Sequence, residues 1–496
     1  MNRLSRLAFG LLLLTVSASA QTGFRPHQAV VRVHSYATID ALLDLWSAQT
    51  HGVTVLKSID ARQIYLLELP LGKDELQAEI ELLGYVNPNP NVVDPARPLM
   101  LADLNEDNEA SEGSTGTIWF SSNPELDPYL EQFAVDRLGL SAAHQSSTGS
   151  GVTIAVIDTG VDESHLTISG AVRSDGWNFV SNSSDVSDIG NGLDDDSDGW
   201  FDEMAGHGTF VASLVLLTAP DAEILPIVAL DSETGFADAF TITQAIYYAV
   251  DGGAQVINLS LGSFDKSDLI EEAIHDARTE GAVVVAAAGN YNNRTEVYPA
   301  STNDALGVAA VDDQDRKAAF SSYNERLAIS APGVSARAPG GEALPDRAVL
   351  GAITTNTDPI AAWDGTSFAA AFVSGSAALL WAQNPQFAAS EGSVEAIEDF
   401  LIDTAVNIDP LNPAYEGELG AGRLDAEAAL ALGRCAACDI NENRTVDLGD
   451  VGFLLAQWGF TKTSQGDFFE GDVNFDGIVD LSDLGIMLGR FGDTCN

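Results

Sequence analysis

Four polar residues, widely separated along the chain, have neighbours that suit covalent catalysis. Asp158 ends the apolar run VTIAVID, and His207 lies between two glycines in AGHGTFVAS. Asn290 follows VVVAAAG, and Ser367 opens the apolar stretch SFAAAFVSG. A histidine that an aspartate orients can take the proton of a serine, while the serine N–H and an asparagine amide bind the oxyanion. Each residue alone would suit a turn or a helix cap, but the four together predict an acyl-transfer site.

The stretches between these residues predict the fold that would bring them together. From about residue 118 to 433, apolar and β-branched runs typical of buried parallel strands alternate with helical patterns. The strand runs are VTIAVID, AEILPIVAL, QVINLSL, AVVVAAAGN and LGVAAV, and the helical segments are ITQAIYYAVDGG and DLIEEAIHDARTEG. This alternation predicts an α/β fold with a doubly wound, mostly parallel sheet and helices on both faces. In such sheets functional residues gather at the carboxyl ends of the strands.

The stretches VIDTGVD, GHGTFVAS, AAAGN and GTSFAAAFVSG, in this order, resemble the motifs of the subtilisin family of serine proteases. The resemblance covers residues 118–433 and implies a serine endopeptidase that works through an acyl-enzyme, with protein or peptide substrates. It implies a triad of Asp158, His207 and Ser367, with Asn290 as oxyanion donor. It also implies substrate-binding residues, which would line the specificity pocket and pair with extended substrate backbone: Ser260, Leu261, Gly262, Ala287, Ala288 and Gly289.

Two departures from the family pattern follow the serine. Phe368 stands where the family usually has Met, and Ala371-Phe372 where it usually has Pro-His. These apolar replacements suit a core helix and concern packing more than chemistry. The alternative is a catalytically inactive binding or surface protein with this fold, which the intact triad disfavours. A broad degradative enzyme and a narrow processing protease are not separated by the sequence.

The beginning of the chain predicts export. Arg3 and Arg6 precede the apolar run 7–16, and Ala18-Ser19-Ala20 is a small-x-small cleavage site, so residues 1–20 predict a signal peptide cut before Gln21. The run is too short to span a bilayer, and we expect a secreted, extracellular or cell-surface protein without a membrane span. The 73 Asp and Glu against 23 Lys and Arg give a net charge of −50, which excludes nucleic acid and anionic membrane surfaces as partners.

Residues 24–98 predict a small α+β domain. AVVRV and IYLLELP have the patterns of strands, and TIDALLDLWSAQ and KDELQAEIELLG those of amphipathic helices. In size, position and pattern the domain resembles the inhibitory propeptide of subtilisin-family proteases, so its partner would be its own protease. A permanent accessory domain is the alternative. Residues 99–117 are acidic, contain Gly and Ser, and predict a flexible linker, with maturation cleavage in it or just after it, before Asp127.

An acidic stretch precedes His207. In DIGNGLDDDSDGWFDE (188–203) carboxylates alternate along the chain without a lysine or arginine among them, and alternating carboxylates followed by glycine can fold around calcium. The candidate ligands are Asp194, Asp196, Asp198 and Asp202. The alternative is a solvated acidic loop.

The C-terminal region contains two copies of an acidic pattern. DINENRTVDLGD (439–450) and DVNFDGIVDLSD (472–483) repeat with a period of 33, and an apolar helical stretch follows each. Oxygen-bearing side chains at positions 1, 3, 5, 9 and 12 predict two calcium loops, each with one exiting helix. The candidate ligands are Asp439, Asn441, Asn443, Asp447, Asp450, Asp472, Asn474, Asp476, Asp480 and Asp483.

Aspartate at position 12 and the single helix per loop resemble the dockerin family, over residues 435–496. The resemblance implies a small all-α calcium-binding domain that attaches to cohesin-like modules or a cell-surface partner. A calcium-stabilised tether without a cohesin is equally consistent, and Arg444 at position 6, where the second loop has Gly477, predicts a weaker first site. Cys495 can form a disulfide with either Cys435 or Cys438, which leaves one odd thiol.

Overall fold

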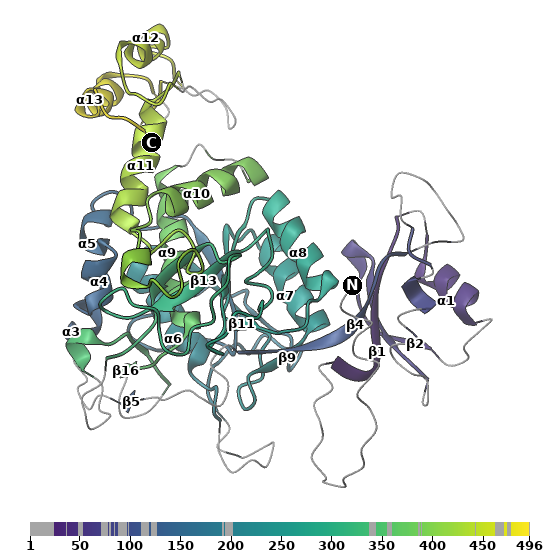
Figure 1. Ribbon diagram of the computed structural model, residues 1–496. Helices are drawn as coiled ribbons and strands as arrows, with labels where there is room; N and C mark the ends of the chain where they lie inside the picture. The colour runs from purple at the N-terminus through teal and green to yellow at the C-terminus, as the bar shows by residue number, and fades with distance from the viewer. Residues whose placement is uncertain are drawn as a thin grey trace.

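The computed structural model consists of an N-terminal domain (residues 24–110), a central unit (126–438) and a C-terminal module (439–495), shown from purple to yellow in Figure 1. The residues that the structure describes are 24–35, 37–47, 53–70, 78, 81–83, 85–87, 97, 99–110, 119–120, 126–190, 193, 202–336, 344–354, 360–384, 387, 389–441, 443–461, 471–473 and 478–495. The predicted signal peptide lies outside them. None of the helices described is long and apolar enough to cross a membrane.

The central unit is built on a seven-stranded sheet in the order β14-β13-β12-β10-β6-β8-β7. The strands are β6 (Thr153–Asp158), β7 (Trp177–Asn178), β8 (Glu223–Val228), β10 (Val256–Leu259), β12 (Val283–Ala287), β13 (Leu306–Val311) and β14 (Ile329–Pro332). Every neighbouring pair is parallel. The predicted doubly wound parallel sheet is therefore confirmed, and the pattern analysis missed only the edge strands β7 and β14.

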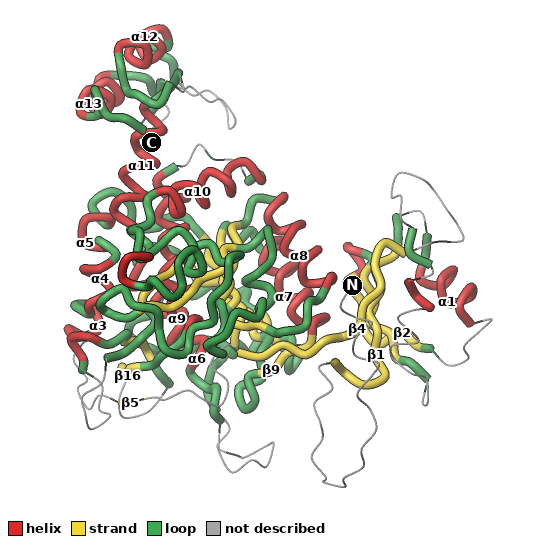
Figure 2. The backbone as a smooth tube through the Cα atoms, viewed as in Figure 1, coloured by secondary structure: helices red, strands yellow, loops and turns green. Residues whose placement is uncertain are grey.

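Helices cover both faces of this sheet because successive side chains of each strand point to opposite sides. Ile154 and Val156 of β6 join one core, with α6 (His207–Thr218), α9 (Thr366–Gln383), α10 (Glu391–Asp403) and α11 (Ala426–Cys438). Ala155 and Ile157 join the other core, with α7 (Ala239–Asp251) and α8 (Asp268–Thr279). Figure 2 shows the helices on both sides of the sheet. The helices α6 and α9 are buried all round, which suits their mostly apolar sequences without charged residues other than the histidine of α6.

Shorter elements complete the central unit. They are α3 (Asp127–Leu130), α4 (Phe133–Arg137), α5 (Leu140–Ala143), the 3-10 turns η4 (Pro345–Arg347) and η5 (Asp409–Leu411), and the strands β9 (Phe236–Asp238), β11 (Leu261–Gly262), β15 (Leu350–Ala352) and β16 (Ile360–Ala362). The strand β16 pairs antiparallel with β15 and with β5 (Trp119–Phe120), which forms a small separate sheet.

The N-terminal domain is an antiparallel sheet in the order β4-β1-β3-β2. It contains β1 (Phe24–Val33), α1 (Ile39–Ser47), β2 (Thr54–Ile59), the 3-10 turn η2 (Asp60–Arg62), β3 (Ile64–Glu68) and β4 (Leu99–Ala110). The predicted strands AVVRV and IYLLELP are present as β1 and β3, whereas β2 was missed. Most of the predicted helix KDELQAEIELLG lies outside the described residues.

The prediction of a flexible linker at 99–117 is wrong for its first twelve residues, because Leu99–Ala110 form the strand β4. The strand pairs with β1 in its own domain and then continues into the central unit, where it pairs with β9 and β11. The acidic sequence of β4 is typical of an unstructured segment, but its backbone N–H and C=O groups form hydrogen bonds with three other strands, β1, β9 and β11. Such non-local pairing outweighs the low strand preference of Asp, Asn and Glu. The remainder of the predicted linker, 111–117, lies outside the described residues.

The C-terminal module contains α12 (Leu448–Ala456) and α13 (Leu481–Gly489) around a small core of its own. A disulfide joins Cys435 of α11 to Cys495, with a Cα–Cα distance of 5.6 Å. This settles the open choice of partner, and Cys438 is the buried free thiol. Both Asp447 and Asp480 cap the helices that follow them with reciprocal capping boxes, so each acidic loop leads directly into its helix.

Candidate active site

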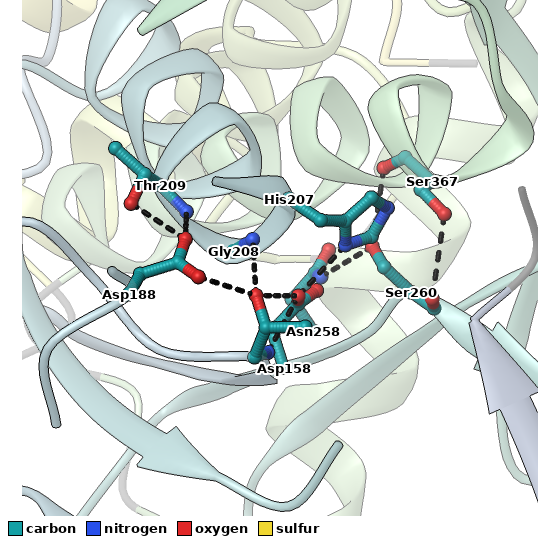
Figure 3. Close-up of polar contacts among 9 residues, drawn as sticks. Asp158, Asp188, His207, Gly208, Thr209, Asn258, Ser260 and Ser367 are labelled. Carbon is teal, nitrogen blue, oxygen red and sulfur yellow. Dashed lines mark hydrogen bonds and ion pairs between the residues drawn. The ribbon is translucent and has the colours of Figure 1, made fainter. Parts of the chain in front are cut away.

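Three elements bring the predicted catalytic residues to one place. Asp158 is the last residue of β6, His207 the first of α6, and Ser367 the second of α9. All three side chains are fully buried. Figure 3 shows the imidazole of His207 between the carboxylate of Asp158 and Ser367. The carboxyl end of a central strand and the N-termini of two helices thus meet, as expected for this type of sheet.

The histidine contacts the carboxylate of Asp158 and two aromatic rings. Its Nδ1 lies 2.7 Å from Oδ1 of Asp158, which also accepts the Thr159 N–H at 2.7 Å. The ring centroids of Trp363 and Phe368 lie 5.5 and 5.6 Å from that of His207. An Asp158 carboxylate requires a proton on Nδ1, which leaves Nε2 of the neutral ring as a proton acceptor. The phenylalanine that departs from the family pattern therefore packs against the imidazole.

Ser367 lies in the first turn of α9, where backbone N–H groups have no partner within the helix. Its Oγ is 3.3 Å from the carbonyl oxygen of Ser260, and Oγ of Ser260 donates to the carbonyl of Ser367 at 3.2 Å. Asn258 donates to the same Ser260 hydroxyl at 2.9 Å. The start of α9 is therefore fastened to the segment that follows β10.

Asn290 follows β12 and faces the start of α9. Its Oδ1 accepts both the N–H and the hydroxyl of Thr366, each at 3.1 Å, and Oγ1 of Thr366 accepts the Gly289 N–H at 3.1 Å. Because the oxygen of the amide has two donors, its NH₂ group is left to donate elsewhere. Asn290 therefore lies beside the first turn of α9, which carries Ser367.

The residues predicted to line the specificity pocket lie in two segments, here called the two walls, which follow the neighbouring strands β10 and β12. Ser260, Leu261 and Gly262 follow β10, and Ala287, Ala288 and Gly289 end or follow β12. A valine that the sequence analysis did not single out, Val297, contacts both walls. A Cβ added at Gly262 would lie 2.6 Å from Val297 Cγ1, and one added at Gly289 would lie 3.2 Å from its Cγ2. Since Gly289 also has a φ of +88°, glycine is required there on two grounds.

An extended chain already lies along the first wall. In β4, Glu109 pairs with Gly262 and Ala110 with Leu261, antiparallel to β11. On its other edge the same strand pairs with β9, Asn108 opposite Ala237. The sequence analysis expected an extended backbone to pair with residues 260–262, and in this structure the chain's own β4 does so.

The calcium predictions fall partly outside the described residues. Asp194, Asp196, Asp198, Asn474 and Asp476 lie there, while Asp202 is described and its N–H donates to Glu233 at 2.6 Å. Among described residues, no group of three or more His, Cys, Asp and Glu side chains is placed to hold a metal ion.

In the described part of the loop 439–450, carboxylates accept backbone N–H groups of the same loop. Asp450 is fully buried and accepts the N–H groups of Asn441 and Asp447 at 2.9 and 2.8 Å, and Asp439 accepts that of Asn443 at 3.0 Å. Arg444 at position 6 has a φ of +67°, the left-handed conformation that a glycine usually supplies there. The five candidate ligands of this loop offer carboxylate and amide oxygens, which suit a hard cation.

The sequence analysis missed one further residue beside the candidate triad. Asp188, the first residue of the acidic stretch, is fully buried beside Asp158 and binds Thr159 and Thr209 (Figure 3). Because several acidic residues follow it, nothing in the local pattern set it apart from a solvated loop.

Known proteins resemble the chain over this central unit. A model of the subtilase family matches residues 149–428. Thermitase from Thermoactinomyces vulgaris is 33% identical over 280 residues, 56% of this chain and 92% of thermitase. Subtilisin Savinase from Lederbergia lenta is 33% identical over 308 residues, 60% of this chain and 97% of that protein.

A solved structure resembles the fold over a longer range. Fervidolysin from Fervidobacterium pennivorans, a keratinolytic enzyme related to subtilisin, aligns with a TM-score of 0.58 at 21% identity, over 82% of this chain and 61% of that one. The family match spans more than half of the chain, and thermitase is covered almost completely. The chain therefore belongs to the subtilase family of serine endopeptidases.

Proposed function

We propose that Ser367 attacks the carbonyl carbon of a peptide bond, that His207 Nε2 takes the serine proton, and that Asp158 orients the imidazole and stabilises its charged form. The observation that carries this proposal is the buried contact of 2.7 Å between His207 Nδ1 and Asp158 Oδ1 at the start of α6, beside the start of α9. Because both side chains are fully buried, solvent screens the interaction between them only weakly.

We propose that the oxyanion of the tetrahedral intermediate is bound by Asn290 and by the Ser367 N–H. The two hydrogen bonds that Asn290 Oδ1 accepts from Thr366 support this, because they hold the amide beside the first turn of α9 and leave its NH₂ group able to donate. The His207 imidazolium then protonates the leaving amine, and a water molecule hydrolyses the acyl-enzyme by the reverse sequence.

Labelling of the active serine tests the triad. The secreted protein, matured in calcium, is treated with a fluorophosphonate and compared with Ser367→Ala by intact mass. A single adduct on the wild type alone is expected. A fully matured wild type without an adduct would contradict the proposal and favour an inactive binding protein.

We propose that the pocket between residues 260–262 and 287–289 accepts small side chains. Val297 supports this, since its two methyl groups lie where the walls approach each other. The preferred residue before the cut bond would then be small, whether apolar or polar.

We propose that the N-terminal domain is an inhibitory propeptide of an exported zymogen. Two observations support this: β4 lies between β9 and β11 as a substrate backbone would, and β5 is paired on the far side with β16, which leads to Ser367. The segment 111–118 joins β4 to β5 along the chain. Self-cleavage within residues 111–118 follows, earlier than a cut just before Asp127.

We propose that the C-terminal module binds calcium through its two acidic loops and attaches the enzyme to a cohesin-like or cell-surface partner. Asp439, Asn441, Asn443, Asp447 and Asp450 would hold the ion in the first loop. In the second loop Asp472, Asp480 and Asp483 occupy equivalent positions. The ion would supply fixed positive charge that offsets the repulsion among these carboxylates.

A further inference from the structure

Asp188, a second buried carboxylate beside the triad, has no part in the mechanism given above. Its side chain is 0% exposed, and Oδ1 accepts the Thr159 hydroxyl at 2.9 Å. Its Oδ2 accepts the N–H and the hydroxyl of Thr209 at 2.9 and 2.7 Å. Among the described residues no lysine or arginine pairs with it. A buried carboxylate without an opposite charge is costly, so packing alone does not account for it.

We propose that Asp188 is a positioning residue, which sets Asp158 and His207 for catalysis through Thr159 and through the first turn of α6. The inference rests on the proposed function, because it assumes that Asp158, His207 and Ser367 form the triad.

The first route runs through the hydroxyl of Thr159. This oxygen accepts the Gly208 N–H at 3.0 Å, so its single proton must go to a carboxylate. Oδ1 of Asp188 lies 2.9 Å away and Oδ1 of Asp158 lies 3.3 Å away. The nearer acceptor takes the proton, which leaves Asp158 Oδ1 to the imidazole and the Thr159 N–H. A carboxylate that accepts fewer hydrogen bonds holds an imidazolium more strongly.

The second route runs through the helix that begins with His207. The residue before it, Gly206, cannot cap α6 with a side chain. Asp188 takes this role from a position 21 residues before Thr209, whose N–H belongs to the first turn of the helix. Carboxylates are favoured at this end of a helix by the free N–H groups and by the macrodipole. The contact fixes the backbone that carries the imidazole.

The charge of Asp188 also acts on the imidazole. Burial raises the pKa of the Asp188 carboxyl, while hydrogen bonds from Gly206 and Thr209 favour its ionised form and oppose the rise. The titratable groups at this cluster are Asp158 and His207; Thr159, Thr209 and the aromatic neighbours of the histidine carry no charge. Two carboxylates near one imidazole favour its protonated form more than one does.

The test compares Asp188→Asn with the wild type in the mature enzyme, using a chromogenic peptide substrate across pH. We expect kcat/KM to fall roughly 10- to 100-fold, the range for a misplaced reacting group, with KM within about twofold. The acid limb of the kcat/KM profile should move to lower pH, because His207 loses a neighbouring charge and Asp158 gains the Thr159 hydroxyl as a donor. The matched control is Asp425→Asn, which makes the same change at the N-cap of α11, where Asp425 accepts the Ala428 N–H at 3.0 Å. This variant should leave kcat/KM and the position of the acid limb unchanged.

Thr159→Val provides an independent measurement if Asp188→Asn does not mature. It should lower kcat without moving the acid limb, since the charge of Asp188 remains. In the double variant the combined loss should be smaller than the product of the two single losses, because the hydrogen bond between Thr159 and Asp188 is common to both variants. Wild-type kcat in both single variants, losses that multiply, or a fall in activity with an unmoved acid limb in Asp188→Asn would each overturn the inference. A wild type that the fluorophosphonate does not label would instead contradict the proposed triad.

Discussion

Replacing Asp103 with alanine should weaken the inhibition of the central unit by the N-terminal domain. The side chain lies on β4 and is 2% exposed. Its Oδ2 accepts the N–H groups of Asp268 and Leu269 at 2.9 and 3.4 Å, and the Ser267 hydroxyl at 3.3 Å. The N-terminal domain thus supplies a carboxylate to the N-terminus of α8, a helix that also has its own cap, Ser267.

The expected loss of binding free energy follows from the hydrogen bond of 2.9 Å to Asp268 and from the position of the carboxylate at the N-terminus of α8. A hydrogen bond to a charged acceptor contributes about 1.5–3 kcal/mol, and placement at a helix N-terminus adds about 0.3–1 kcal/mol. Allowing for the two longer contacts, we expect a loss of about 2–3 kcal/mol, which corresponds to an inhibition constant raised roughly 30- to 150-fold.

The assay adds fragment 24–110 to the matured enzyme and measures its inhibition constant. Asp40→Ala is the matched control, because Asp40 is an exposed carboxylate on α1 of the same domain, and the variant makes the same change of charge. Equal inhibition constants for the two variants would refute the reasoning, since they would mean that the contact with α8 contributes nothing to the affinity.

Four other outcomes are expected. Val297→Ala should raise kcat/KM for substrates with Phe relative to Ala before the cut bond by roughly tenfold, as peptide kinetics would show, because it removes methyl groups from the pocket. Mass spectrometry should find a new N-terminus within residues 111–118, and none in Ser367→Ala. Chelation of calcium should lower the unfolding free energy of the C-terminal module by about 2–3 kcal/mol in calorimetry, and Asp450→Asn should abolish this dependence. Burial raises the pKa of Cys438 to about 11, so iodoacetamide at pH 8 should alkylate this thiol only in denatured protein.

The parallel sheet and the positions of the catalytic candidates were predictable because both depend on local patterns. The buried strands have continuous apolar runs, and Asp158 and Asn290 follow such runs directly. Helix starts were also visible, since a histidine and a serine each follow a glycine and precede a long apolar stretch. These signals lie within a few residues of the feature that they predict.

The missed features depend on partners that are distant in the sequence. Nothing within 99–110 predicts a strand, because its partners β9 and β11 lie more than a hundred residues further on. Asp188 was missed for the same reason, since its partners Thr159 and Thr209 are more than twenty residues away in the sequence and contact it only in the folded chain. Local composition describes a residue's neighbours in sequence, and these residues act on neighbours in space.

The disulfide between Cys435 and Cys495 has a consequence for an enzyme that cuts polypeptides. It closes a ring of chain around both acidic loops and both helices of the C-terminal module. A single nick between these cysteines, whether by the enzyme itself or by another protease, would leave both fragments covalently joined to α11. The attachment that we propose for this module would therefore survive such damage, and would be lost only when the disulfide is reduced or the chain is cut before Cys435.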